Sequence, residues 1–309
     1  MEPFRIAHIA DLHLSAEHKR TNLRRARRLL EEIRRRRVDH VVVTGDIAAD
    51  ADGREFEIAR RLFRNAGLLD PAKLSVVIGN HDVFGGVHRA EDILTFPRRV
   101  RQTDVERQVE EFRSSFKEAF DRCMFGAQGK AFPYAKVLGD VVLFGVNSVA
   151  RHSGVKNPVG SNGEVGDGQF KRLRHLMEVP QLREKTKVVL VHHHFNKLSA
   201  AGEGALNSVW GAIERQTMKL YGKGRLFDLF REHRVAAVLH GHVHVNMEYE
   251  RKGVRFFNGG GSLLGTPGDV VFNLLSVTSD GVESRTIRIP DEISASPAAE
   301  RPTPELQAA

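Results

Sequence analysis

The sequence predicts an α/β fold, because strand-like runs alternate along the chain with segments that have helical periodicity. Runs rich in Val, Ile and Leu, typical of buried strands, occur at residues 4–10, 39–45, 74–79, 187–194 and 235–244. The chain has 309 residues, of which 41% are hydrophobic, so it can form one large core. We therefore expect a single domain over residues 1–289.

The first helix-like segment is the arginine-rich run NLRRARRLLEEIRRRR, residues 22–37. Its apolar residues recur at spacings of three and four, which predicts one buried helix face: Leu23, Ala26, Leu30 and Ile33. Glu31 and Glu32 precede Arg35 and Arg36 by four residues, a favourable spacing for pairing along a helix. The run is therefore interpreted as a solvated helix face rather than a nucleic-acid patch.

A second helix is predicted over residues 54–67, where Gly67 is a candidate C-cap. Residues 86–130 follow the third strand and have few strand signals, so we expect a helical insert there. Residues 132–148 predict two short strands around a Gly-Asp turn, and residues 248–289 predict a β-meander. The tail, residues 290–309, is rich in Pro, Ala and Glu and is expected to be disordered.

The composition favours a cytoplasmic protein with an anionic partner. Cys123 is the only cysteine, which excludes an intrachain disulfide and is typical of a reducing compartment. The N-terminus does not resemble a signal peptide, and no apolar run approaches the roughly 18 residues that span a membrane. The net charge of +8 favours anionic substrates; nucleic acid remains an alternative that is not favoured. Oligomeric state is left open.

Residues able to bind metal ions follow five of the strand-like runs directly. They are Asp11, Asp46, Asn80, His192 and His242. In open α/β sheets, ligands bind outside the carboxyl ends of the strands, where such residues converge. His13 and His244 lie two residues beyond the first and last of them. Mixed oxygen and imidazole ligands suit a pair of borderline divalent ions better than calcium or a structural zinc.

These motifs, in this order, resemble those of the calcineurin-like metallophosphoesterases. The matching residues are DLH (11–13), GD (45–46), GNHD (79–82), HHH (192–194), GHVH (241–244) and NGGGS (258–262). The resemblance extends over about residues 4–265 and is weakest in the helical insert. It implies a four-layer αββα sandwich of two mixed sheets, with a dimetal site at one edge. The sequence most resembles the bacterial class III cyclic-nucleotide phosphodiesterase branch.

The resemblance implies a role for each candidate residue. Asp11, His13 and His244 would hold one metal ion, and Asn80, His192 and His242 the other. Asp46 would bridge the two ions, which are expected to be manganese, iron or zinc. The triple histidine leaves His193 and His194 as alternatives to His192. His81 would contact the phosphate and act on the leaving oxygen, with its ring oriented by Asp82 or by Asp50.

Two metal ions about 3.5–4 Å apart can share a hydroxide and clamp the attacking and leaving oxygens of an in-line displacement at phosphorus. The resemblance implies a phosphodiesterase that uses this chemistry on a small phosphoester, with 3′,5′-cyclic nucleotides among its candidates. The alternatives within the superfamily are a nuclease, a lipid-precursor pyrophosphatase and a phosphomonoesterase. The alternative outside enzymes is a metal-free interaction scaffold.

Overall fold

Two large β-sheets form the centre of the computed structural model, which describes residues 2–18, 20–88, 90–196, 218–264 and 269–290. The predicted disordered tail therefore lies, from residue 291 onward, outside the described residues. The first sheet has five strands in the order β14 (Gly281–Ile289), β13 (Val270–Thr278), β1 (Phe4–Ile9), β2 (His40–Thr44) and β3 (Leu74–Val77). Strands β1, β2 and β3 are parallel, so their carboxyl ends share one edge.

The second sheet has seven strands. Their order is β11 (Asn246–Arg251), β12 (Val254–Gly259), β10 (Ala237–His240), β8 (Thr186–Leu190), β6 (Val141–Gly145), β5 (Tyr134–Leu138) and β4 (Met124–Phe125). Strands β12, β10, β8 and β6 are parallel to one another. A small separate sheet pairs β7 (Gly163–Glu164) with β9 (Leu220–Tyr221).

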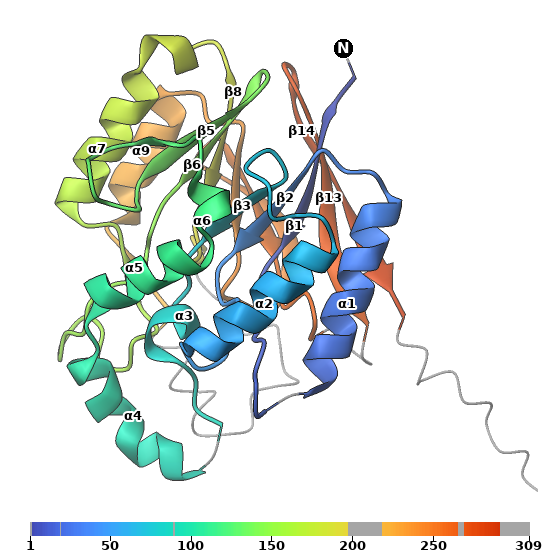
Figure 1. The fold of residues 1–309 in the computed structure, drawn as a ribbon. Helices are drawn as coiled ribbons and strands as arrows, with labels where there is room; N and C mark the ends of the chain where they lie inside the picture. The colour runs from blue at the N-terminus through green and yellow to red at the C-terminus, as the bar shows by residue number, and fades with distance from the viewer. Residues whose placement is uncertain (1, 19, 89, 197–217, 265–268, 291–309) are drawn as a thin grey trace, which may run out of the picture.

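Helices cover the outer faces of the paired sheets. Figure 1 shows α1 (Arg20–Arg35) and α2 (Gly53–Asn65) on one side, and α7 (Asp167–Glu178) and α9 (Lys223–Glu232) on the other. One hydrophobic cluster joins the facing surfaces of the two sheets and continues under α1 and α2, while a second fills the space beneath α7 and α9. This arrangement confirms the four-layer αββα sandwich.

Alternating side chains on the strands create these two clusters. On β8, Val188 and Leu190 belong to the cluster between the sheets, whereas Val189 packs beneath the outer helices. Both faces of the strand are therefore apolar, which explains its uninterrupted hydrophobic run. The predicted helix at residues 22–37 is also confirmed, because α1 buries Ala26, Leu30 and Ile33 against the first sheet.

Helices occupy most of the segment between β3 and β4. They are α3 (His81–Phe84), α4 (Ala90–Gln102), α5 (Val105–Ser115) and α6 (Lys117–Phe120). Helix α5 contacts α2, and α6 contacts β3, so this segment adds to the layer beside the first sheet. Among the helices of the described residues, none combines the length and apolarity needed to cross a membrane.

The prediction of one β-meander over residues 248–289 was wrong. Strands β11 and β12 form an antiparallel hairpin in the seven-stranded sheet, whereas β13 and β14 form one in the five-stranded sheet. The chain crosses between the sheets after Gly259, and the Ser262 hydroxyl accepts a hydrogen bond from the Ala10 N–H at 3.0 Å. Local alternation predicts each hairpin but does not say to which sheet it belongs.

Candidate metal centre

The carboxyl ends of parallel strands from both sheets meet at one edge of the sandwich. Strands β1, β2 and β3 lead to Asp11, Asp46 and Asn80, and strands β8 and β10 lead to His192 and His242. The two sheets are joined here by hydrogen bonds: the His242 N–H lies 3.1 and 3.0 Å from the two Asp11 carboxylate oxygens. The structure thus brings together all five residues that the sequence placed after strands.

The backbone at this edge departs from ordinary strand and helix conformations. Positive φ angles occur at Asp11 (53°), His13 (42°), Asp46 (50°) and His242 (74°). Non-glycine residues seldom adopt this region, and such conformations cluster at functional sites. All four residues lie in the loops that follow β1, β2 and β10.

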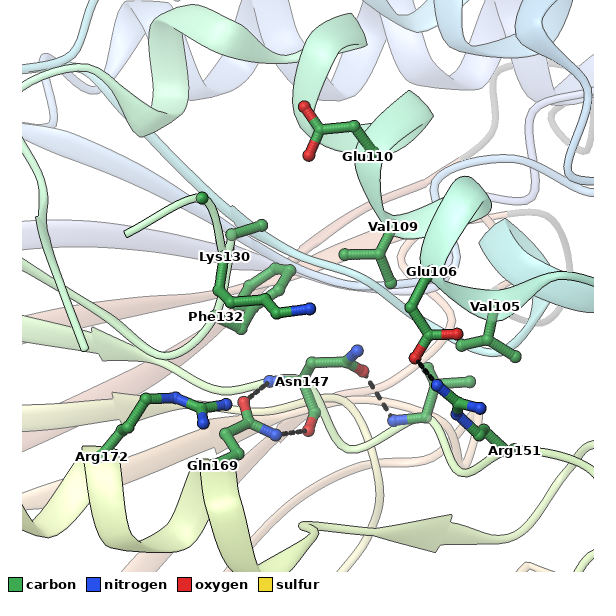
Figure 2. A pocket seen from close by; sticks show the side chains of 13 residues that line it. Val105, Glu106, Val109, Glu110, Lys130, Phe132, Asn147, Arg151, Gln169 and Arg172 are labelled. Carbon is green, nitrogen blue, oxygen red and sulfur yellow. Dashed lines mark hydrogen bonds and ion pairs between the residues drawn. The ribbon is translucent and has the colours of Figure 1, made fainter. Parts of the chain in front are cut away.

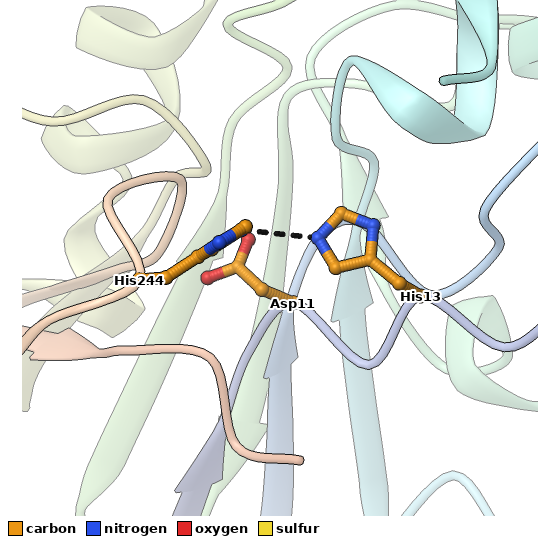
Figure 3. A group of neighbouring side chains, drawn as sticks. All are labelled: Asp11, His13 and His244. Atoms are coloured by element: carbon orange, nitrogen blue, oxygen red, sulfur yellow. Dashed lines mark hydrogen bonds between the residues drawn. The ribbon is translucent and has the colours of Figure 1, made fainter. Parts of the chain in front are cut away.

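Asp11, His13 and His244 form the first group of potential ligands. Figure 3 shows the Asp11 carboxylate and the two imidazole rings turned toward one another. One ligand atom from each lies within 4.8 Å of the others, and the two Nε2 atoms of His13 and His244 are 3.0 Å apart. Asp11 and His13 are buried, whereas His244 is exposed, so this group is open to solvent on one side.

Asp46, His192 and His242 form the second group, and it is fully buried. The Nε2 atom of His192 lies 2.9 Å from Asn80 Oδ1, 3.2 Å from His242 Nδ1 and 3.4 Å from Asp46 Oδ2. Its Nδ1 lies 2.9 Å from the Thr44 carbonyl oxygen. Because a carbonyl only accepts, this contact places the proton on Nδ1 and leaves Nε2 free to ligate.

Asp46 connects the two groups. Its Oδ2 lies 3.4 Å from His192 Nε2 and 4.0 Å from His13 Nε2. Its Oδ1 accepts a hydrogen bond from the His81 N–H at 2.8 Å. The carboxylate therefore has the position that a bridging ligand requires.

The donor set fits cations. Carboxylate oxygens, an amide oxygen and imidazole nitrogens with free lone pairs converge, and such atoms repel one another unless a proton or a metal ion lies between them. Burial would lower the pKa of His192, but Asp46 and Asp11 raise it to about 9, so the buried carboxylates hold positive charge beside them. Burial raises the pKa of Asp11 well above its usual range. A site for two metal ions follows from these groups.

Gly79 and Gly241 allow the backbone to approach the carboxylates of the centre closely. A Cβ on Gly79 would lie 2.2 Å from Asp46 Oδ1, and one on Gly241 would lie 2.7 Å from Asp11 Oδ2. Side chains at either position would displace a carboxylate of the centre. The glycines of the GNHD and GHVH motifs are therefore required by close approach rather than by a turn.

His81 borders the centre. Its ring centroid lies 4.5 Å from that of His13. One of its ring nitrogens also lies within 4.8 Å of a ligand atom of His13 and of Asp46. Its Nδ1 lies 3.2 Å from the Ala49 carbonyl oxygen. That acceptor requires a proton on Nδ1, so Nε2 is the atom that can exchange a proton with a bound molecule.

The expected orientation of the His81 ring by Asp82 or Asp50 is corrected by these contacts. The Asp82 oxygens accept hydrogen bonds from the Ala48 and Gly79 N–H groups, at 2.8 and 2.9 Å. Asp50 pairs with His88 at 2.7 Å. The carbonyl of Ala49 is the ring's partner. Asp82 instead connects the two turns that carry Asp46 and Asn80. The Ala49 carbonyl could not be predicted as the partner of His81, because every residue has a backbone carbonyl.

The three adjacent histidines, residues 192–194, differ in the groups that their rings contact. His192 faces the second group, whereas the Nδ1 of His193 lies 2.8 Å from the Ser148 hydroxyl oxygen. The ring of His194 packs against that of His240, with centroids 5.1 Å apart. The ring of His193 also packs beside that of His242, with centroids 4.5 Å apart, but its Nδ1 is directed to Ser148, so His192 is the candidate ligand. The contact of Ser148 with His193 was not predicted, because nothing in the sequence distinguishes this serine except that it follows a strand.

Comparisons with known proteins agree with this geometry. The family model for calcineurin-like phosphoesterases matches residues 4–246. A dimetal phosphatase from Danio rerio has a similar structure (TM-score 0.60, 14% identity), with 94% of this chain and 100% of that chain covered. The purple acid phosphatase PPD1 from yellow lupin, Lupinus luteus, is also similar (TM-score 0.54, 15% identity), with 91% of this chain and 51% of that chain covered.

At these identities the structural similarity concerns the fold alone. No curated protein sequence matches the chain significantly. The family match extends from the first strand to just beyond His244, and so includes every candidate ligand. The chain therefore belongs to the calcineurin-like phosphoesterase family, whose members hydrolyse phosphoester bonds.

Proposed function

We propose that this protein is a dimetal phosphodiesterase, with manganese, iron or zinc as its metals and 3′,5′-cyclic nucleotides as the first natural substrates to test. The observation that carries the proposal is the convergence of both ligand groups on Asp46, with His81 beside them and its Nε2 free. When bound, two metal ions supply Lewis acidity for the phosphoryl oxygens and an activated water nucleophile.

The chain's own residues have three tasks in this proposal. Asp11, His13 and His244 hold one ion, Asn80, His192 and His242 hold the other, and Asp46 bridges them. The Ala49 carbonyl fixes the ring of His81 so that its Nε2 delivers a proton to the leaving oxygen. The Thr44 carbonyl fixes His192 in the ligating tautomer.

A pocket beside His81 supports a diester rather than a monoester. Besides Asn80 and His81 it is lined by Gly85, Gly86, Val87, Phe96, Val159 and Ser161. Its walls are about equally polar and apolar, and no lysine or arginine is among these residues. Without a cationic side chain, such a lining suits a phosphoryl group with one negative charge better than it suits the dianion of a monoester.

Hydrolysis of bis(p-nitrophenyl) phosphate and of p-nitrophenyl phosphate tests the proposal. The protein is first stripped with a chelator and then supplied with manganese, iron or zinc. We expect diester turnover that returns with metal, is lost in Asp46→Asn and is unchanged in Asp228→Asn, an exposed carboxylate on α9. Preference for the monoester would indicate a phosphatase instead. No turnover with any of the metals would favour the noncatalytic scaffold.

A further inference from the structure

A second pocket lies away from the candidate metal ligands, between α5, the segment before β5, the end of β6 and α7 (Figure 2). It is open and has a volume of about 240 Å³. Sites for drug-sized ligands measure about 300–1,000 Å³, so this pocket is suited to a smaller molecule. None of the candidate metal ligands lines it.

The unpaired charge in this pocket is positive. Its two carboxylates both have cationic partners: Glu106 pairs with Arg151, and Glu110 lies 3.7 Å from Arg113. Lys130 and Arg172 have no carboxylate partner among the described residues. Arg172 also has a buried Nε without a hydrogen-bond partner in the described part of the chain. A half-buried guanidinium in this state is suited to an anion.

Asn147 adds a fixed donor. Its backbone N–H donates to Gln169 Oε1 at 2.9 Å, and its carbonyl accepts from Gln169 Nε2 at 2.7 Å. Its side-chain Oδ1 accepts from the Val149 N–H at 2.8 Å. These bonds occupy the acceptor of the carboxamide and leave the Nδ2 donor directed into the pocket, as Figure 2 shows. The site is preformed, so binding does not require this side chain to be ordered.

The remaining lining residues are largely apolar. Val105, Phe132 and Val149 line the pocket and are themselves almost fully buried. Figure 2 shows the Lys130 side chain beside Phe132 and the Arg172 guanidinium beside Gln169. The accessible lining is therefore more polar than apolar, with a small apolar floor beside convergent donors, which suits a small anion with a short apolar body.

We propose that this pocket is a second binding site, distinct from the metal centre, for a small organic anion. Lys130, Arg172 and the Asn147 carboxamide bind its phosphate or carboxylate group. Val105 and Phe132 contact its apolar body. The inference does not depend on the phosphodiesterase proposal, because it rests on residues outside the metal centre.

Phenylphosphonate tests the site, because it carries an aryl group and a dianion but has no ester bond to hydrolyse. Titration calorimetry on the metal-loaded protein should show a binding site in this pocket, whether or not the metal centre provides a second one. In Lys130→Gln/Arg172→Gln we expect one site to be lost. In Lys130→Gln alone, an exposed change that does not threaten the fold, we expect that site to weaken roughly tenfold.

Arg174→Gln is the matched control, since Arg174 lies on α7 with Arg172 but pairs with Glu232 at 2.7 Å. This variant should bind phenylphosphonate as the native protein does. Benzoate in place of phenylphosphonate separates a carboxylate ligand from a phosphorylated one. Neutral benzamide should not bind. Unchanged binding of phenylphosphonate in the double variant, or equal binding of benzamide by the native protein, would overturn the proposal.

Discussion

The Nδ1 atom of His192 and the carbonyl oxygen of Thr44 lie 2.9 Å apart, in a contact that joins the seven-stranded sheet to the five-stranded sheet. This contact directs Nε2 of His192 to the atoms of Asn80, His242 and Asp46. The packing of the two sheets and the ligation of the second metal ion therefore depend on the same imidazole.

His192→Gln should leave the protein with about one metal ion per chain, because only the buried group loses its central ligand. His194→Gln is the control from the same triple histidine, and it should retain both ions, since its ring packs against His240. Elemental analysis of the folded, dialysed proteins measures both. Equal metal loss in the two variants would show that direction along this segment does not select the ligand.

His81→Asn should lower kcat for the diester roughly 10²- to 10⁴-fold, the usual loss when general acid catalysis is removed. Its metal content should stay at that of the native protein, because the proposal gives His81 no ligand role. Steady-state kinetics beside elemental analysis separate the two effects. Loss of a metal ion together with the rate would instead identify His81 as a ligand through its contact with His13 and Asp46.

Gly79→Ala should reduce both metal binding and stability, because its Cβ would lie 2.2 Å from Asp46 Oδ1 and 2.3 Å from the Asp46 backbone nitrogen. Overpacking of this kind costs about 1–3 kcal/mol of the free energy of unfolding. Gly224→Ala is the control, since a Cβ there meets nothing within 4 Å. Thermal unfolding and metal analysis of both variants check the expectation, and native behaviour of Gly79→Ala would refute it.

His40 gives a pH prediction away from the centre. Its ring nitrogens lie 2.9 Å from the Ala72 carbonyl oxygen and 2.9 Å from the Ser75 hydroxyl oxygen, and burial lowers its pKa from 6.5 to about 3. Between these values the unfolded chain binds a proton that the folded protein does not, so the His40 contribution to stability is lost as pH falls below about 6.5.

His40→Gln removes this titration. The free energy of unfolding of the native protein, relative to that of the variant, should therefore fall by about 1 kcal/mol between pH 7.5 and 5.5. Urea unfolding of both proteins at the two pH values measures it. A difference that does not change with pH would mean that His40 titrates normally in the fold.

The sequence predicted the α/β class and the strands that lead to the metal centre, because strands buried on both faces are uninterrupted apolar runs, as in β8. It also predicted which strand ends carry the candidate metal ligands that the fold brings together, since these residues follow the runs directly. It did not predict the crossing between sheets after Gly259, because hairpin patterning is local. Partners that are backbone atoms, such as the Ala49 carbonyl at His81, were also missed.

Metal stoichiometry tests the central claim most directly. Elemental analysis of the native protein, after loading with manganese and removal of free metal, should give two ions per chain. Asp46→Asn should give one or fewer, since a neutral amide would replace the carboxylate whose Oδ2 faces both ligand groups. Asp228→Asn should again give two. A native protein that holds one ion or none, or an Asp46→Asn variant that keeps both, would contradict the account.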